Sequence, residues 1–470
     1  MKTVRLTALT LALALGGCVN LAPDYQRPGP AIPEGWKAGS QPVVDAVATP
    51  APALAWREFF IDDRLRQVIK TALDNNRDLR VAALNIERAR AQYAIQRAAL
   101  LPTVNATGSA SRTRTAEDLT ATGRSTTLNQ YGASVGVASY ELDLFGRIGN
   151  LNEAAIQAYL SLDETRRSVQ ISLLSDVATT WLTLAADQRR LRLAQETLRS
   201  QQASYDLTVK ARDIGNESGL TLAQARTTVD SARSDVAAYS RAIAQDRNLL
   251  ALLVGSSVPD ALLPVVDEGL MTVTPLVNVP EGLPSTLLQN RPDVLAAEHT
   301  LQAANANIGA ARAAFFPRIT LTGSAGSGSR DLSNLFESGN GAWSFAPQIV
   351  IPIFSGGALQ ASLDVARVTR DINVAQYDKT IQTAFREVAD ALDARATLQE
   401  QLDAQRSLRN ASEQAYRLSQ ARYRTGVDSY LDTLVTQRSL YAAGQTLITL
   451  ELAEQSNRLA LYRTMGGGWQ

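Results

Sequence analysis

The sequence has little of the chemistry on which most metal sites and nucleophilic sites depend. Its 470 residues contain one cysteine, Cys18, and one histidine, His299. A disulfide bond within the chain therefore cannot form. Zinc sites and serine–histidine triads also have poor support, because His299 lies in a predicted helix and has no second histidine with which to share a metal. We expect His299 to be a structural or surface residue.

The chain also lacks a net charge. Lys and Arg together number 46, and so do Asp and Glu. The protein therefore has no overall field that would attract nucleic acid, and no basic cluster stands out. The glycine clusters at 323–328 and 466–468 lie at a strand end and in the tail, and neither has the pattern that cradles phosphate. These absences argue against an enzyme, a cofactor, a bound metal and a nucleic-acid partner.

The first residues are typical of a secretory signal. Lys2 and Arg5 precede an apolar segment at 6–15 that is too short to span a bilayer. Leu15-Gly16-Gly17-Cys18 resembles a bacterial lipobox, in which cleavage leaves Cys18 as an acylated N-terminus. The alternative is an ordinary signal-peptide cysteine. We predict a signal peptide at 1–17 and lipid attachment at Cys18, and then a proline-rich N-terminal tether at 18–60.

A long heptad stripe organises the middle of the chain. Between residues 150 and 212 a seam recurs at alternating spacings of three and four, which is typical of one narrow face on a long helix. Neither proline nor glycine interrupts the segment, so 63 residues at ~1.5 Å each predict a rod of roughly 95 Å. The seam consists of Leu174, Val177, Trp181, Leu184, Gln188, Leu191, Gln195, Leu198, Gln202, Tyr205, Val209 and Arg212.

The chain contains an internal repeat, at a shift of 215 and then 211 residues. Each copy begins with a helix, at 78–99 or 293–314, which is followed by a proline, two strands and a long helical hairpin. The hairpin turns fall at 214–219 and 424–429, and each contains the glycine that a helix end prefers. We predict a first repeat at 61–270 and a second at 271–470.

The strands alternate between one apolar face and one face of small polar residues. In the first strand Val104, Ala106, Gly108 and Ala110 occupy every second position. This period is what a membrane-spanning β-strand needs, although a half-buried hairpin of a soluble protein shows it too. Four strands cannot close a barrel, and an open edge in lipid leaves backbone groups unpaired. Several copies must then share one barrel, with loops at 112–129 and 327–341 on the outer surface.

At this point the residues resemble a known family, the TolC-like outer-membrane factors, and within it the lipidated OprM-type channels. The resemblance covers essentially the whole mature chain. Val19 stands where lipoproteins retained at the inner membrane have aspartate, which implies delivery to the outer membrane. The motifs that carry the resemblance are Pro23-Asp24-Tyr25-Gln26-Arg27-Pro28, Trp56-Arg57-Glu58-Phe59-Phe60, Asn75-Asn76-Arg77-Asp78-Leu79, Tyr140-Glu141-Leu142-Asp143-Leu144-Phe145-Gly146-Arg147, Ala310-Ala311-Arg312-Ala313-Ala314-Phe315-Phe316-Pro317, Arg422-Tyr423-Arg424-Thr425-Gly426-Val427-Asp428 and Gly466-Gly467-Gly468-Trp469.

The resemblance implies a mixed α and β membrane protein. Its fold is a homotrimer in which each chain gives four strands to one outer-membrane β-barrel and two hairpins to a periplasmic α-helical barrel. It also implies a passive conduit that docks on a periplasmic membrane-fusion adaptor and a proton-driven inner-membrane pump of the RND type, and exports drugs or other toxic small molecules. The alternatives are the outer-membrane channel of a type I protein secretion system and a structural coiled-coil lipoprotein.

By the same resemblance the periplasmic gate maps onto Tyr423 and Leu431, near the turn of the second hairpin. Val435 departs from the family pattern, which has an acidic residue there; Asp432, one turn away, is a candidate to replace it. The alternative is that Tyr423 and Leu431 only pack between helices. We predict ion pairs among Arg422, Arg424, Arg438, Asp428 and Asp432, and adaptor contacts at the hairpin tips, at Gly215, Asn216, Gly426 and Val427.

Overall fold

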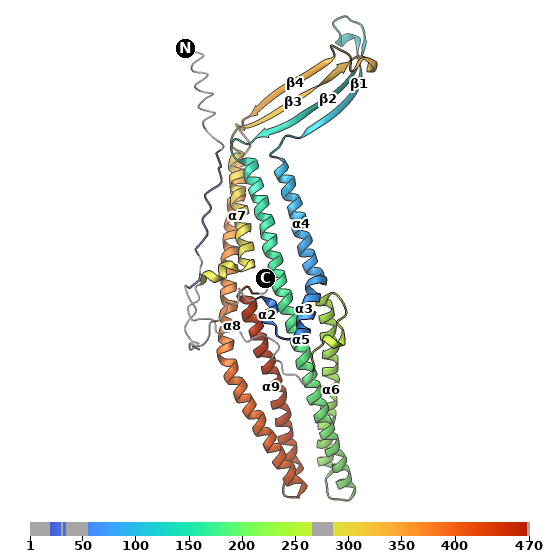
Figure 1. Ribbon diagram of the computed structural model, residues 1–470, viewed down its shortest axis with the longest axis vertical. Coiled ribbons are helices and arrows are strands. Elements are labelled where there is room, and N and C mark those ends of the chain that lie inside the picture. The colour runs from blue at the N-terminus through green and yellow to red at the C-terminus, as the bar shows by residue number, and fades with distance from the viewer. Residues whose placement is uncertain (1–18, 30–31, 34–54, 266–284, 468–470) are drawn as a thin grey trace. The chain divides into compact units, whose positions relative to one another are not determined.

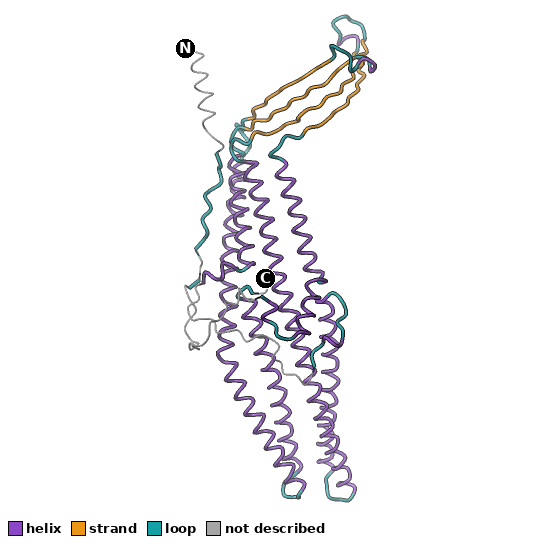
Figure 2. Tube along the Cα trace, viewed as in Figure 1, coloured by secondary structure: helices purple, strands orange, loops and turns teal. Residues whose placement is uncertain are grey.

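The computed structural model describes residues 19–29, 32–33, 55–265 and 285–467, and Figure 1 shows their helices and strands. Helix predominates, and the strands form one sheet (Figure 2). Cys18, the predicted lipid-attachment site, lies outside the described residues. The elements in chain order are α2 (Trp56–Phe59), α3 (Asp63–Asn75), α4 (Arg77–Ala98), β1 (Val104–Thr115), η2 (Glu117–Leu119), β2 (Thr126–Leu142), α5 (Arg147–Asp213), α6 (Gly219–Val254), η3 (Asp260–Leu262), η4 (Ser285–Asn290), α7 (Pro292–Ala313), β3 (Arg318–Ser329), η5 (Leu332–Asn334), β4 (Gly341–Val350), α8 (Ala358–Arg424) and α9 (Tyr430–Thr464).

The predicted internal repeat is visible in the lengths of matching elements. Helices α4 and α7 both have 22 residues, strands β1 and β3 both have 12, and helices α5 and α8 both have 67. The returning helices α6 and α9 have 36 and 35 residues. Only the second strands differ clearly, because β2 has 17 residues and β4 has 10. The same supersecondary unit therefore occurs twice.

The chain folds into two compact units, and each takes residues from both repeats. Unit 1 contains the sheet, with residues 1–29, 85–162 and 296–377. Unit 2 contains the two helical hairpins, with residues 30–84, 163–295 and 378–470. The division by contacts therefore cuts across the division by sequence repeat.

Unit 1 contains a four-stranded antiparallel sheet in the order β1-β2-β3-β4. Ala106 pairs with Val135, Val135 with Ala325, and Ala325 with Trp343, so these side chains share one face. Ile319 and Ile349 pair on that same face, which we call the apolar face. Thr107 and Thr322 lie on the opposite face, the polar face, as their alternation in the sequence predicts.

The strands extend beyond the predicted loop boundaries. β1 continues to Thr115 and β2 begins at Thr126, so the connection between them is shorter than the predicted loop at 112–129. The predicted boundary was wrong because we placed the strand end where apolar and polar residues stop alternating. The backbone pairing of β1 with β2 continues beyond that point, through Arg112–Asn129 and Arg114–Thr127. Backbone hydrogen bonds do not depend on the polarity of the side chain.

Strand β2 contains a β-bulge where its pairing with β1 has ended. Val137 pairs with Gly323 and Tyr140 with Leu321, so one extra residue lies on β2. Ser139 takes a left-handed backbone conformation there, with φ of 58°. As a result Tyr140 and Leu142 return to the apolar face, and Glu141 lies on the polar face with Arg318.

In unit 1 an extended segment at 19–29 follows helix α7. The Arg27 guanidinium donates two hydrogen bonds to the buried Glu298 carboxylate, at 2.8 and 2.6 Å, and the Tyr25 hydroxyl donates a third. Nearer the sheet, the backbone N–H of Val19 donates to the carbonyl of Leu144 at 3.2 Å. This part of the predicted tether is therefore held along the helix by specific contacts.

Unit 2 has its main hydrophobic core where α3, α5, α6 and α9 meet. Trp181 of α5 is fully buried, and its indole N–H donates to the carbonyl of Leu262 at 3.2 Å. Phe59 stacks on Tyr462 with ring centroids 3.9 Å apart. Phe59 thus belongs to the core cluster, although the predicted tether extends to residue 60. Helix α5 is apolar enough by length and composition to cross a membrane, but 61% of its apolar window is buried in the protein.

Candidate functional site: the tips of the helical hairpins

The two hairpin turns, both in unit 2, have the same backbone geometry. Gly215 and Gly426 end helices α5 and α8 in the left-handed conformation, with φ of 78° and 74°. The N–H of Asn216 donates to the carbonyl of Ala211 at 2.8 Å, and that of Val427 to Arg422 at 2.9 Å. These are Schellman motifs, in which glycine is required by the positive φ rather than by lack of space, since a Cβ would meet nothing within 4 Å.

The second turn is closed by a bidentate ion pair. Nε and Nη2 of Arg422 donate to the two carboxylate oxygens of Asp428 at 2.6 and 2.7 Å. The hydrogen bond from Arg422 holds the pKa of Asp428 below its usual range, so the pair persists at neutral pH. Arg424 and Arg438 are exposed, and within the described residues neither forms an ion pair. Of the three predicted arginines, only Arg422 forms an ion pair with another described residue.

Asp432 has a local structural role at the start of α9. Its carboxylate accepts hydrogen bonds from the backbone N–H and the hydroxyl of Ser429, at 3.2 and 2.7 Å, while Ser429 caps the N–H of Asp432. This reciprocal arrangement is a capping box. Both hydrogen bonds are accepted by Oδ2 of this exposed carboxylate, and the replacement by Asp432 of the acidic residue missing at Val435 stays a prediction.

Tyr423 joins the two tips. Its hydroxyl donates to Oε1 of Glu217, in the first turn, at 3.3 Å. Its ring lies 5.4 Å from that of Tyr430, centroid to centroid, and both border a small cluster with Ala225 and Leu434. Burial, and then the negative charge of Glu217, raise the pKa of the Tyr423 hydroxyl. Burial also raises the pKa of Tyr430 to about 12. Both hydroxyls are therefore neutral at physiological pH.

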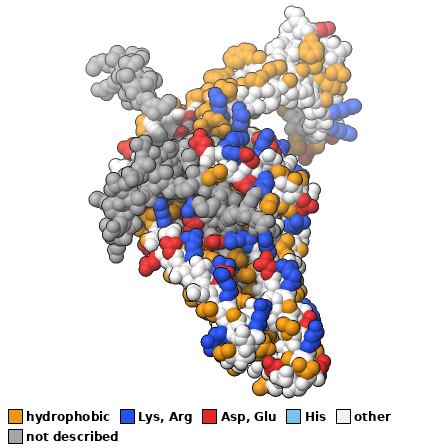
Figure 3. Space-filling view, turned by 60° about the horizontal axis from the view of Figure 1, so that its bottom comes forward, with side chains coloured by type: hydrophobic (Ala, Val, Ile, Leu, Met, Phe, Trp, Pro, Cys, Tyr) orange, Lys and Arg blue, Asp and Glu red, His pale blue; other side chains and the backbone are white. Residues whose placement is uncertain are grey.

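Leu431 is exposed, unlike Tyr423. Val427, Leu431 and Val435 recur every four residues and are 62%, 54% and 55% exposed in the single chain. Leu431 and Val435 share one face of α9, whereas Val427 lies in the turn before that helix. Figure 3 shows hydrophobic side chains intermingled with charges of both signs over the helices. The two predicted gate residues thus differ: Tyr423 packs within the chain, as the alternative interpretation expects, and Leu431 does not.

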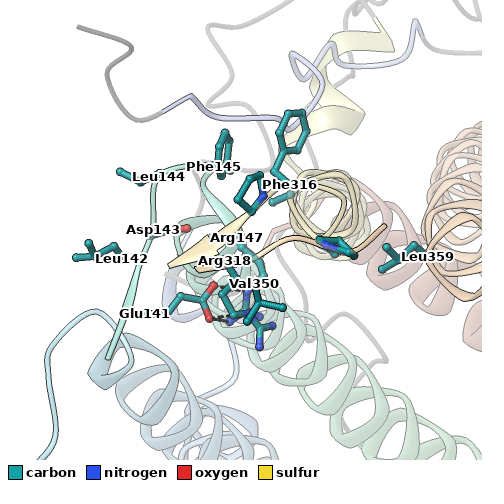
Figure 4. A pocket seen from close by; sticks show the side chains of 14 residues that line it. Glu141, Leu142, Asp143, Leu144, Phe145, Arg147, Phe316, Arg318, Val350 and Leu359 are labelled. Atoms are coloured by element: carbon teal, nitrogen blue, oxygen red, sulfur yellow. Dashed lines mark hydrogen bonds and ion pairs between the residues drawn. The ribbon is translucent and has the colours of Figure 1, made fainter. Parts of the chain in front are cut away.

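A second polar cluster lies in unit 1, where the strands meet the helices. A pocket of about 270 Å³ is bordered by Glu141, Arg147 and Arg318 (Figure 4). Arg147 donates two hydrogen bonds of 2.7 Å to the Glu141 carboxylate, and Arg318 lies 3.3 Å from it. Glu141 and Arg147 belong to one of the family motifs, but the sequence alone assigned no function to them. In the structure they fix the passage from β2 into α5.

His299 is engaged structurally. Its Nδ1 lies 2.7 Å from Oε1 of Gln157 on α5. Among the described residues, no three His, Cys, Asp or Glu side chains are grouped as a metal site would require.

These observations define a class of protein. A sheet with one apolar and one small polar face, with unpaired outer edges on β1 and β4 in the described chain, is a segment of a β-barrel that lipid surrounds. Its strands continue into two long helical hairpins. The class is that of membrane channel subunits in which strands and helical hairpins alternate.

Comparison with known proteins identifies the family. The family model described as "Outer membrane efflux protein" matches residues 68–256 and 283–467, and the chain belongs to this family of outer-membrane efflux channels. The toluene efflux pump outer membrane protein TtgC of Pseudomonas putida is 49% identical over 99% of this chain and 95% of TtgC. A Pseudomonas aeruginosa membrane protein of known structure is 40% identical, with a TM-score of 0.89 over 96% of this chain and 98% of its own. The open state of the Neisseria gonorrhoeae MtrE outer membrane channel is 37% identical, with a TM-score of 0.86 over 96% and 99%.

The predicted fold class, efflux function and outer-membrane location are thereby confirmed. The family is a transport component rather than an enzyme family.

Proposed function

We propose that this protein is a passive conduit that three copies of the chain build together. The observation that carries the proposal is the open sheet of unit 1, whose β1 and β4 edges need partners in lipid. Three copies would supply twelve strands, an even number within the range of bacterial outer-membrane barrels. The apolar face would then contact lipid and the polar face would line a water-filled passage.

The conduit would receive its substrates from other proteins. TtgC is named as part of a toluene efflux pump, and by analogy a periplasmic adaptor and an inner-membrane pump of the RND type would deliver drugs, solvents or other toxic small molecules to this chain. The hairpin tips, with Gly215, Asn216, Gly426 and Val427 all exposed, are the proposed adaptor contacts. No step of this transport requires a catalytic residue or a cofactor.

The tip of the second hairpin would be the gate. The exposed apolar side chains of Leu431 and Val435 on α9, and of Val427 in the turn, support an apolar constriction, because three copies around an axis would bring three such sets together. The bond from Tyr423 to Glu217 would hold the two hairpins of one copy in the closed arrangement. The pair of Arg422 and Asp428 would keep the second turn in shape while the hairpins move.

Acylation of Cys18 would add a lipid anchor to the barrel. The contact between Val19 and Leu144 supports it, because it holds the residue next to Cys18 at the end of β2. Cys18→Ser should abolish the acyl chains found by mass spectrometry on the mature wild-type protein. Fatty acid that remains on the purified Cys18→Ser protein would contradict this assignment.

A type I protein secretion channel is a second candidate for the same architecture, and a structural coiled-coil lipoprotein is a third. The lipoprotein has less support, because such a protein would not need a sheet with one face suited to lipid. Export assays separate the efflux conduit from the secretion channel. If the protein is an efflux conduit, loss of this chain should sensitise cells to small toxic molecules without blocking the secretion of a protein.

Planar-bilayer conductance tests the gate. In the purified trimer, Leu431→Ser combined with Tyr423→Phe should increase the closed-state current, because the constriction becomes wettable and the link to Glu217 is lost. A control for the leucine is Leu207→Ser, since Leu207 is a leucine of comparable exposure in the first hairpin. An unchanged closed-state current in the correctly assembled Leu431/Tyr423 variant would defeat the gate hypothesis.

A further inference from the structure

The apolar face of the sheet carries no charged side chain over six successive rows. Each row joins residues that pair across the strands, and successive rows are two residues apart along β3. From the helical end, the rows are Leu142–Ile319–Ile349, Tyr140–Leu321–Pro347, Val104–Val137–Gly323–Phe345, Ala106–Val135–Ala325–Trp343, Gly108–Ala133–Ser327–Gly341 and Ala110–Tyr131–Ser329.

The height of these rows matches the hydrocarbon core of an outer membrane. Five steps of two residues at ~3.4 Å each, on strands tilted by ~40°, span roughly 26 Å. The outward-facing apolar band of a transmembrane barrel is ~25 Å tall. Tyr131 occupies the last row, at the level where barrels place an aromatic girdle. The next rows on this face therefore lie at the level of lipid headgroups.

Both of the next rows carry an arginine. Arg112 pairs with Asn129, and Arg114 pairs with Thr127, on the continuation of the apolar face. Because the helices are attached to the other ends of the strands and are periplasmic, this end of the sheet is at the outer leaflet. Arg112 is one step and Arg114 two steps above the band, within about 10 Å of it.

The two guanidinium groups have no acidic partner in the described chain. Both are exposed, and Nη2 of Arg114 donates only to the neutral hydroxyl of Ser125, at 3.3 Å. Glu117 and Asp118 are nearby in sequence, but no ion pair joins either to Arg112 or Arg114 among the described residues.

We propose that Arg112 and Arg114 form a binding site for the phosphorylated glycolipid of the outer leaflet. The two arginines would bind its phosphate groups. Guanidinium groups recognise phosphate through paired, charge-assisted hydrogen bonds. Lipid binding at this site is separate from transport. It rests on the proposed function in one respect, because both require the apolar face of the sheet to face the membrane lipid.

Binding of purified lipopolysaccharide to the detergent-extracted, full-length trimer tests the site. The wild type should bind phosphorylated lipopolysaccharide at least about tenfold more tightly than the same lipid stripped of phosphate. Arg112→Gln with Arg114→Gln should remove that preference. Arg112→Lys with Arg114→Lys should keep part of the preference for the phosphorylated lipid. Lysine has the positive charge of arginine but lacks the planar guanidinium group that donates two parallel hydrogen bonds. Arg124→Gln, which removes a charge from the turn between β1 and β2, should leave the preference within about twofold.

Equal binding of the two lipids by the wild type would overturn the proposal, as would an unchanged preference in the double Gln variant. The second result would assign the arginines to the other role that charge has on an edge strand, the prevention of incorrect strand pairing. Bilayer conductance separates this test from that of the transport function. The double Gln variant should conduct like the wild type, whereas a wild-type chain that forms no conducting trimer would refute the conduit instead.

Discussion

The two repeats share a backbone and differ in their side-chain chemistry. At the hairpin tips, the same Schellman turn ends α5 and α8, but the acidic residue of each turn has a different partner. Asp428 is bound by Arg422 of its own turn, whereas Glu217 accepts a hydrogen bond from Tyr423 of the other hairpin. The second tip is thus closed on itself, and the first is linked to its neighbour. The two repeats therefore share the backbone of the turn, and differences in a few side chains connect the first tip to the second through a hydrogen bond.

A similar difference occurs farther along the returning helices. Asp246 of α6 corresponds to Asn457 of α9 at the shift of 211 residues. Asn457 donates to the carbonyl of Ala391 at 2.9 Å. Asp246 instead has one carboxylate oxygen buried without a hydrogen-bond partner in the described chain. Burial, and then the charge of Asp187, raise the pKa of Asp246 to about 6. The first hairpin therefore contains a titrating group where the second has a neutral amide.

The largest predicted effect tests whether both repeats use the same face toward lipid. Val135→Lys in the first repeat and Phe345→Lys in the second, both in the middle rows of the apolar face, should each block assembly. A lysine that faces lipid near the middle of the bilayer costs roughly 2–4 kcal/mol, whereas Ile319→Lys and Ile349→Lys, in the end row, should cost only about 0–1 kcal/mol. Thr107→Lys and Thr322→Lys, on the polar face, should be tolerated. The measurement is recovery of the detergent-resistant oligomer from outer membranes; equal recovery from both sets would show that the face assignment is wrong.

A smaller effect is expected at the seam where strands of the two repeats pair. A Cβ on Gly326 of β3 would lie 2.1 Å from the carbonyl oxygen of Ala133 on β2. Gly326→Ala should therefore destabilise the sheet by about 1–3 kcal/mol, because the backbone of β2 or β3 must shift to make room for the methyl group. Gly328→Ala is the matched control, since the nearest atom to its Cβ is 3.8 Å away. Thermal unfolding of the extracted oligomer should separate the two, and equal unfolding temperatures would contradict the close approach.

The smallest predicted effect makes the first hairpin resemble the second. Because the pKa of Asp246 is raised in the folded state, the folded protein binds more protons between pH 4 and about 6. The contribution of Asp246 to stability should thus fall as pH rises through this window and stay low above it. Asp246→Asn should remove that contribution and stabilise the protein at pH 7.5 by about 1 kcal/mol, a value reduced for partial exposure. Asp74→Asn, at an exposed position of α3, is the control and should not stabilise the protein at pH 7.5. A difference in melting temperature between wild type and Asp246→Asn that is the same at pH 4.5 and pH 7.5 would disprove the prediction.

Periodicity in the sequence was enough to predict the helices and the two faces of the sheet. The long helix expected at 150–212 extends from Arg147 to Asp213, and the returning helix α6 begins at Gly219, the last residue of the turn expected at 214–219. Heptad spacing predicts such helices because the buried stripe repeats throughout their length. The extension of β1 beyond Ala110 was missed, because its exposed end has no apolar pattern to reveal it.

Some features that the prediction missed had a readable local signal, and others did not. Ser429 followed three residues later by Asp432 is the pattern of a capping box, and Asp62 is a helix cap directly before α3. By contrast, Arg27 binds Glu298 across 271 residues of sequence, and Tyr423 binds Glu217 across 206. Such partners are brought together only by tertiary packing, so neither local pattern nor composition identifies them.

Because of the bulge at Ser139, strand β2 should tolerate the deletion of one residue at that position better than a deletion elsewhere along the strand. Along a strand, loss of one residue exchanges the two sides for everything beyond the deletion. In β2, however, three steps separate Val137 from Tyr140 although both lie on the same side. Deletion of Ser139 would therefore restore simple alternation and leave Glu141 facing Arg318, whereas deletion of Ser134 would put side chains of the wrong polarity into lipid. During evolution, single-codon losses in this strand would survive at the bulge and be eliminated elsewhere.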